Sequence, residues 1–441
     1  YVGRINYGLM DRYLLTASLR YDGSSRLSEG NKWALFPSAA IAWRITEEDF
    51  AKNLNWLSNL KLRFSYGQAG NTNSVSPYAS EGTISGSVYY PFGTSTSVGN
   101  LPANIANPML TWERTSEYNV GLDFGFLNQR ISGNIEYYNR TTNDLLMKRN
   151  IPVHLGYSSV TSNVGSVRNS GFELQLNTAN IMTKNFAWNT TINLAYNKNE
   201  IVSLADEEDL SNYSIHLQGM RGRYSDKRFI GKPVDTNWTQ NTIGVWQLGE
   251  EEEAAKYGCV PGNFKIKDYN NDGKLTDDDY IIDGKRTPDW TGGMTNMFKI
   301  YDFDFSFHMY FQAGATQYDR FFENFALEWN SQNFNNLRTN YWTPENPSNT
   351  MGRPSQMGSR GNIAYERTDF LKVSYITLGY TLNKRLMSKW GLDNARIYVT
   401  VQNPFILTKF RGLDPEQPDL TNIGDTDGMT MNALLGVNIS F

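Results

Sequence analysis

A short acidic segment in the second half of the chain has the residue types and spacing of a cation-binding loop. Asp268, Asn270 and Asp272 alternate along this segment, and Gly273 follows them directly. Carboxylate and amide oxygens at positions one, three and five, with glycine for the sharp turn at position six, form the ligand pattern of an EF-hand-like calcium loop. The segment 268–279 is therefore predicted to bind a divalent cation, and Ca²⁺ is the ion that the pattern favours.

The remainder of this segment supplies weaker ligands. Lys274 offers its backbone carbonyl at position seven, and Thr276 reaches the ion directly or through water at position nine. Asp279 stands at position twelve, where a longer Glu is usual, so Mg²⁺ remains an alternative. A polar turn in which Asp and Asn side chains bond the backbone without an ion is the other interpretation. A bound ion is expected to hold a long loop in shape rather than to take part in a reaction.

Aromatic side chains in the predicted loops are a second set of candidates. Flat rings with a polar tip stack on sugar faces, and the same rings also pack ordinary loops, so both interpretations stand. The candidate substrate-binding residues are Trp238, Trp246, Tyr318, Trp329 and Tyr341.

The composition argues against several functional classes. The 441 residues include 41 Lys+Arg and 45 Asp+Glu, which excludes a nucleic-acid-binding protein built on overall positive charge. A single cysteine, Cys259, leaves no internal disulfide and no cysteine-based metal cluster. No phosphate-binding glycine motif follows a predicted strand, and no carboxylate pair suggests glycosidase chemistry. We therefore expect a protein that is not an enzyme.

The elements that must position these residues are strands. Apolar and polar residues alternate in 14–22, 305–312 and 395–402, which gives each strand one apolar and one polar face. The same alternation places His308 on the polar face. Thirteen strands are predicted, at about 1–9, 13–22, 35–45, 60–68, 111–126, 130–146, 166–178, 186–200, 291–301, 303–313, 366–382, 395–404 and 429–441.

Short and long connections alternate between the predicted strands. Short turns on one side and long loops on the other are typical of an outer-membrane β-barrel, whose short turns face the periplasm. The largest loop, 201–290, contains the acidic segment and is then expected outside the cell. Trp and Tyr at strand ends are expected to form girdles at the two membrane surfaces. The girdle candidates are Trp33, Trp43, Trp112, Trp188, Trp290, Tyr375 and Tyr380.

The two ends of the predicted sheet indicate a part of a longer barrel. The first strand leads into a short turn and the last strand ends on the same side, so the strand count is odd. Bacterial single-chain barrels usually have an even number of strands, so an odd number is expected to be missing before residue 1. The first residues also lack the regions of a signal peptide. A large soluble β-sandwich or propeller is the alternative fold.

Short motifs occur in order along most of the chain. They are RYDGSSR at 20–26, FPS at 36–38, AWRI at 42–45, LRFSYG at 62–67, NSGFEL at 169–174, PDWTGG at 288–293, FLK at 370–372, LGY at 378–380, YVTVQN at 398–403 and GLDPE at 412–416, with Phe441 at the end. Together, though no single one is decisive, they resemble the C-terminal barrel of SusC/RagA-type TonB-dependent transporters of the Bacteroidetes outer membrane.

This resemblance implies a fold and a set of partners. It implies a 22-stranded barrel with an N-terminal plug, of which the chain 1–441 forms about thirteen C-terminal strands. It further implies import of oligosaccharides or peptides with a SusD-like surface lipoprotein as a lid. Contact with TonB would pass through the absent N-terminal part, and outer-membrane lipid would surround the barrel. A passive porin-like channel and a soluble β-rich glycan-binding module are the alternatives, and no nucleic acid is expected as a partner.

Overall fold

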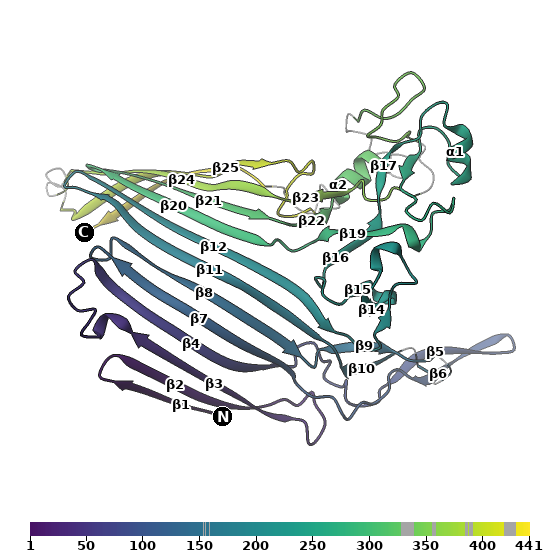
Figure 1. Cartoon of the computed structure of the whole chain (residues 1–441), viewed down its shortest axis with the longest axis horizontal. Helices are drawn as coiled ribbons and strands as arrows, with labels where there is room; N and C mark the ends of the chain where they lie inside the picture. The colour runs from purple at the N-terminus through teal and green to yellow at the C-terminus, as the bar shows by residue number, and fades with distance from the viewer. Residues whose placement is uncertain are drawn as a thin grey trace.

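The computed structural model describes residues 1–152, 154, 156–157, 159–327, 339–354, 359–383, 387, 391–418 and 429–441. Thirteen antiparallel strands form one sheet, and each strand pairs with the next wall strand along the chain (Figure 1). We call this sheet the wall. Its strands are β1 (Val2–Leu9), β2 (Tyr13–Gly23), β3 (Trp33–Arg44), β4 (Leu57–Asn71), β7 (Glu113–Phe126), β8 (Ile131–Asn143), β11 (Ser166–Met182), β12 (Phe186–Ser203), β20 (Trp290–Ile300), β21 (Phe303–Ala313), β24 (Phe370–Thr381), β25 (Asn394–Thr408) and β26 (Asn432–Ser440).

The predicted all-β class, the strand number and the alternation of connections are confirmed. At one end of the wall, β20 and β21 are joined across two residues, and β11 and β12 across three. At the other end, 204–289 separates β12 from β20, and 314–369 separates β21 from β24. All wall connections longer than twelve residues lie at this second end, which we call the loop end.

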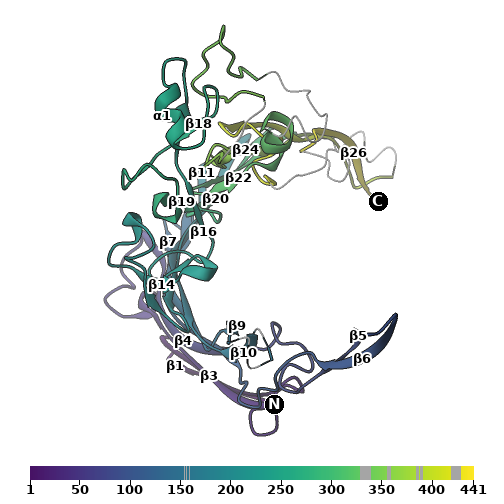
Figure 2. The same cartoon turned by 90° about the vertical axis from the view of Figure 1, so that its right-hand side faces the viewer.

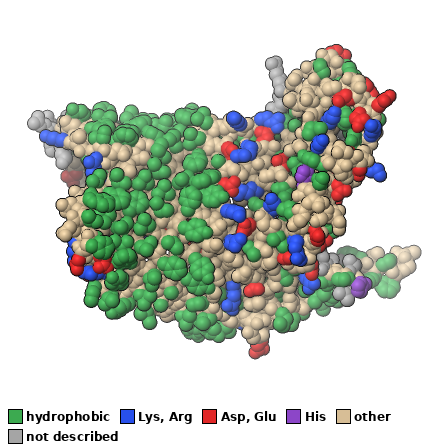
Figure 3. All heavy atoms as spheres, in the orientation of Figure 1, with side chains coloured by type: hydrophobic (Ala, Val, Ile, Leu, Met, Phe, Trp, Pro, Cys, Tyr) green, Lys and Arg blue, Asp and Glu red, His purple; other side chains and the backbone are tan. Residues whose placement is uncertain are grey.

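The wall is curved into part of a ring and is not closed. Figure 2 shows the strands following an arc whose two ends carry β1 and β26. The convex face is covered by hydrophobic side chains along the strands, and charged side chains gather toward the loop end (Figure 3). Outward residues such as Phe64, Val120 and Leu378 are 43%, 43% and 52% exposed. An apolar outer face of this kind is the surface that a bilayer covers.

Most of the predicted girdle residues lie on the convex face. Trp43 and Tyr380 are 36% and 38% exposed there, and Trp188 stacks on the outward Phe298. The prediction was wrong for Trp112 and Tyr375. Trp112 is 7% exposed because it precedes β7 and packs in a buried cluster with Leu27 and Leu110, and Tyr375 lies on the concave face opposite His308.

The long connections between β12 and β20 and between β21 and β24 fold into a compact assembly, which we call the loop region (204–289 and 314–369). One buried cluster joins both connections through Val245, Phe264, Phe322 and Trp342. A second cluster contains Leu210, Leu217, Tyr224 and Phe229. The elements of this region are β13 (Glu208–Asp209), β14 (Arg221–Arg223), β15 (Arg228–Phe229), β16 (Thr236–Gln240), β17 (Thr242–Val245), α1 (Glu251–Lys256), β18 (Phe264–Ile266), β19 (Tyr280–Lys285), β22 (Thr316–Tyr318), α2 (Arg320–Phe322) and β23 (Tyr365–Arg367).

Two further hairpins extend from the loop end. They are β5 (Ile84–Phe92) with β6 (Ser95–Pro102), and β9 (Leu146–Asn150) with β10 (Ser159–Asn163). Within the described part of the chain, no helix combines the length and apolar character needed to cross a membrane.

Candidate functional site

The concave face of the wall carries an extended network of charged and amide side chains. Arg63 on β4 donates to Asp123 on β7 and to Glu136 on β8, each at 2.7 Å. Lys61 also contacts Asp123 at 2.7 Å. Alternation places these residues on the side opposite the apolar convex face, and the antiparallel register brings the three strands together at this level. The network therefore gives the concave face a fixed polar lining.

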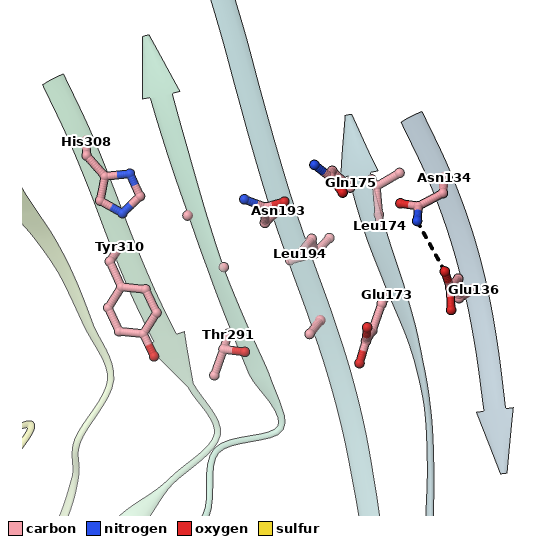
Figure 4. A pocket seen from close by; sticks show the side chains of 13 residues that line it. Asn134, Glu136, Glu173, Leu174, Gln175, Asn193, Leu194, Thr291, His308 and Tyr310 are labelled. Carbon is pink, nitrogen blue, oxygen red and sulfur yellow. Dashed lines mark hydrogen bonds between the residues drawn. The ribbon is translucent and has the colours of Figure 1, made fainter. Parts of the chain in front are cut away.

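An open groove of about 390 Å³ continues this lining across β8, β11, β12, β20 and β21. Figure 4 shows the side chains of Glu136, Glu173, Gln175, Asn193 and Tyr310 along it. Asn134 donates to Glu136 at 3.1 Å within the groove. The lining thus offers carboxylate and amide groups from several strands to whatever occupies the concave side.

Two carboxylates of the groove lie directly opposite each other on neighbouring strands. Glu173 pairs in register with Glu136, and like charges so placed are unfavourable unless something compensates them. Glu136 is compensated by Arg63 and by Asn119, which donates at 3.0 Å. Among the described residues, Glu173 has no hydrogen-bond partner.

His308 lies on the concave face as predicted, and it is held as a wall residue. Its Nδ1 lies 2.8 Å from the Thr295 hydroxyl, and its ring stacks on Tyr375 with centroids 5.7 Å apart. No described Asp or Ser completes a catalytic arrangement with it, since Thr295 is its only side-chain hydrogen-bond partner among the described residues. The arrangement suits binding of a polar surface or solute.

The predicted acidic loop is tightly folded. Asp268 is 6% exposed, and its two oxygens accept the backbone N–H groups of Asn271 at 2.6 Å and Gly273 at 3.0 Å. Gly273 has a φ of +79°, the left-handed conformation that position six of the motif requires. Burial opposes ionisation of Asp268, but the bonds from Gly273, the Tyr257 hydroxyl and Asn271 outweigh it and lower the pKa of its carboxyl.

Asp279 points back into the loop from position twelve. It is fully buried, and its oxygens accept the N–H groups of Tyr269 at 2.8 Å and Thr276 at 2.9 Å. Asp272 accepts the N–H of Lys274 at 2.8 Å, and Asn270 accepts that of Asp272. Across the described ranges, no three His, Cys, Asp or Glu side chains form a group that could hold a metal ion. The donor types and the tight turn at Gly273 match the calcium-loop motif, while the carboxylate oxygens of Asp268, Asp272 and Asp279 accept backbone N–H groups.

The aromatic candidates in the loops occupy different environments. Trp246 is 3% exposed between Tyr257 and the Lys265 ammonium, and Trp238 packs against Phe229 and Tyr280. Tyr318 is partly buried and stacks edge-on against Tyr365.

Among these candidates, Tyr341 is 45% exposed and lines a small cavity of about 120 Å³. Trp329 lies outside the described residues. Of the described candidates, Tyr341 therefore offers the most accessible ring.

The sequence did not single out the concave network or Glu173. The signal was present as polar residues at every second position of 61–63, 134–136 and 173–175, which the alternation assigns to one face. What alternation cannot supply is the register that brings Arg63 to Asp123 and Glu136.

The family assignment follows from comparison with known proteins. The family described as TonB dependent receptor-like, beta-barrel matches residues 3–403, and the chain belongs to this family. The TonB-dependent receptor SusC of Bacteroides thetaiotaomicron is 35% identical over 453 residues, which are 100% of this chain and 43% of that protein. TonB-dependent receptor P26 of Formosa agariphila is 33% identical over 459 residues, covering 100% of this chain and 46% of that protein.

Solved structures agree with this assignment. The RagAB peptide importer in its "open-open" state superposes with a TM-score of 0.79 at 25% identity, covering 100% of this chain and 46% of the other. In its "closed-closed" state the TM-score is 0.77 at 25% identity, with 100% and 47% covered.

The chain spans less than half the length of the curated relatives it matches. Members of this family are outer-membrane β-barrels, so the wall lies in the outer membrane with its convex face toward lipid.

Proposed function

We propose that this chain is the C-terminal barrel part of a SusC-like TonB-dependent transporter that imports oligosaccharides or peptides. One observation carries the proposal: the wall is apolar on its convex face and lined by the Arg63 network on its concave face. Such a wall encloses a polar path for a solute. The RagAB peptide importer supports peptides as cargo, and the resemblance to SusC-type transporters, one of which is 35% identical, supports oligosaccharides. The activity is transport rather than catalysis.

The partners follow from the same proposal. The remaining strands close the ring between β26 and β1, because a spanning sheet needs every edge paired in lipid. An N-terminal plug fills the lumen of this ring. TonB contacts that absent part. A SusD-like lipoprotein covers the loop end, where the loop region and the β5–β6 hairpin project (Figure 1).

Uptake by cells that carry the full-length protein tests the proposal. Cells lacking its gene should lose growth on one class of oligosaccharide or peptide as sole carbon source. Growth should return with the full-length gene and not in a strain without TonB. Purified full-length protein in a planar bilayer should be closed. A large TonB-independent conductance would instead support the passive porin-like channel, and recovery without detergent would support the soluble module.

We further propose that Ca²⁺ binds the acidic loop and has a structural role. Asp268, Asn270, Asp272 and Asp279 would hold it with side-chain oxygens, together with Thr276 and the Lys274 carbonyl. Support comes from the left-handed turn at Gly273 and from the inward position of Asp279, which is fully buried. When bound, the ion would add a positive charge that ties the two halves of the loop together.

Limited proteolysis of the full-length protein tests the calcium site. Ca²⁺ should slow cleavage within 204–289 relative to EDTA, and Mg²⁺ alone should protect less. Asp272→Asn should abolish this difference, while the neighbouring Asp278→Asn should retain it because Asp278 is outside the ligand set. Equal cleavage with Ca²⁺ and EDTA in the unchanged protein would contradict the proposal.

Tyr341 is the residue we propose for stacking on cargo in the loop region. Tyr341→Ala should weaken uptake, and Tyr341→Phe should retain it, because the ring face makes the contact. Equal uptake by all three proteins would remove Tyr341 from the site.

A further inference from the structure

An open groove of about 960 Å³ lies where β21, β24 and β25 reach the loop end. Its apolar floor is a row of Phe311, Leu371 and Leu407, which are in register across the three strands. Leu371 and Leu407 are 37% and 60% exposed. The strands place this row on the same convex face as the apolar belt, so the groove continues the surface that contacts lipid.

Cationic side chains stand above this floor, beyond the strand ends. Alternation places Asp369 and Arg367 on the side of Leu371, and Lys409 on the side of Leu407. Arg367 binds Asp369 through Nε and Nη2, at 3.1 Å and 2.6 Å, which leaves its Nη1 group available. Asp369 also accepts the Gly314 N–H at 2.7 Å and is thereby held in place.

Among the residues that the structure describes, Lys409 is the charge in this groove that has no ionic partner. It is exposed, and it has no ionic or hydrogen-bonding partner anywhere in the described part of the chain. Lys198 is a useful contrast, because it also lies on the convex face near the loop end. Its ammonium contacts Glu200 at 2.7 Å, and Glu200 also pairs with Arg168. The groove therefore combines an apolar row with a free cation, and the Lys198 position does not.

We propose that this groove binds an anionic lipid of the outer leaflet. An acyl chain lies on the Phe311, Leu371 and Leu407 row, and the phosphate of the headgroup contacts the Lys409 ammonium and the free face of Arg367. Two features select this occupant: the groove is continuous with the membrane-facing belt, and the one charge in it that has no ionic partner among the described residues is positive. Charge-assisted bonds from Arg and Lys are the usual means of holding phosphate.

Native mass spectrometry of the full-length protein in detergent tests the site. The probe is a defined phosphatidylglycerol, titrated against phosphatidylcholine of the same chain length. The unchanged protein should retain one phosphatidylglycerol preferentially. Lys409→Gln should weaken its retention about fivefold, and Lys409→Gln combined with Arg367→Gln about 20-fold, as expected for basic groups near a membrane surface. Lys198→Gln should leave retention unchanged, and Lys409→Arg should preserve it.

The floor of the groove has its own test. Leu407→Ser should reduce the retention of long-chain phosphatidylglycerol more than that of a short-chain form, because it removes apolar contact from the acyl chain. These exposed positions are not expected to affect assembly, which heat-modified mobility on gels will verify. Equal retention of the two headgroups, or equal loss in Lys198→Gln and Lys409→Gln, would overturn the proposal and leave the groove to a protein neighbour.

Discussion

The wall and the loop region use the same apolar residue types in opposite directions. In the wall, Leu378 and Val399 point outward and are 52% and 45% exposed. In the loop region, Phe229 and Leu210 are fully buried, and Phe264 is 2% exposed. The wall keeps its charged network on the concave side, whereas the loop region keeps most of its charges at its surface.

The difference reflects two solvents. Water surrounds the loop region, so burial of apolar area drives its folding as in any soluble domain. Lipid covers the convex face of the wall, and there the hydrophobic effect does not favour turning apolar side chains inward. The continuous hydrogen-bond ladder is what the wall must preserve, because no solvent in the bilayer can replace a lost backbone bond. The stability of the wall should therefore depend mainly on its backbone register, and the stability of the loop region mainly on the volume of its buried side chains.

The largest expected effect comes from disturbing the ladder. Gly171 on β11 has no room for a side chain, because an added Cβ would collide with the backbone carbonyl of Tyr196 on β12. Gly171→Ala should force two wall strands apart and prevent assembly of the full-length barrel. The loss would show as absence of the compact, heat-modifiable band on gels of outer membranes.

Gly67→Ala is the matched control for this substitution. The nearest atom to an added Cβ at Gly67 is the Ser38 Cβ at 3.4 Å, an ordinary contact. Gly67→Ala should assemble normally. Equal assembly of both variants would show that the wall tolerates local separation of its strands.

The next largest effect should come from reducing the volume of a buried side chain in the loop region. Phe264→Ala should lower the free energy of unfolding of this region by about 3–5 kcal/mol, because it leaves a cavity in a buried cluster. Urea denaturation followed by tryptophan fluorescence, with Trp342 in the same cluster, measures it.

The same change on the convex face of the wall sharpens the comparison. Phe64→Ala removes a ring that is 43% exposed and leaves no closed cavity, so its cost should be clearly smaller. Similar losses for Phe64→Ala and Phe264→Ala would mean that one packing rule governs both regions.

The contrast also explains what the sequence could predict. Alternation with period two is strong in the wall because each strand separates two different environments, so the strand predicted at 303–313 is the observed β21. The short strands β13 to β19 were not predicted, since two to six residues carry too little alternation. The strand ends were predicted less well: β4 extends from Leu57 to Asn71, beyond the predicted 60–68, whereas β24 begins at Phe370, inside the predicted 366–382.

The candidate sites also differ in how far the sequence could predict them, because one depends on local spacing and the other on strand pairing. The acidic loop was visible because its spacing is local, within 268–279. Which oxygens of Asp268 and Asp279 accept backbone N–H groups depends on the folded turn and could not be read from spacing. The concave network joins Arg63 to Asp123 and Glu136 across strands, so it depends on register. Alternation in the sequence predicts the face on which such residues lie, and the pairing of the strands determines which residues they contact.

A charge introduced on either face of one wall strand should distinguish the lipid-facing side from the aqueous side by its cost in stability. Phe64 and Ser65 are adjacent on β4, with Phe64 outward and Ser65 on the concave face. Phe64→Arg should cost about 2–4 kcal/mol because it puts a cation into the lipid-facing belt near its middle. Ser65→Arg should cost much less in the aqueous interior. Urea unfolding of the full-length protein in lipid vesicles measures both, and equal costs would contradict the assigned faces.

The smallest expected effect is a pH dependence confined to the loop region. Asp319 is fully buried before α2 and accepts the Phe322 N–H at 2.9 Å. Burial raises the pKa of its carboxyl from 3.8 to about 6; the Phe322 bond opposes this rise, nearby Glu366 adds to it, and Arg411 also opposes it. The folded state thus binds the proton more tightly than the unfolded state.

The raised pKa of Asp319 makes the loop region more stable at low pH than at neutral pH. Stability of the loop region should be highest below pH 3.8, fall as the pH rises through 3.8 to about 6, and stay lower above that window. Asp319→Asn keeps the acceptor for Phe322 but cannot ionise, so its unfolding midpoint in urea should change less between pH 4 and pH 8 than that of the unchanged protein. The wall has no part in this difference, and its heat-modified mobility should be the same at both pH values. If Asp319→Asn kept the full pH dependence, the titrating group would be another residue of the loop region.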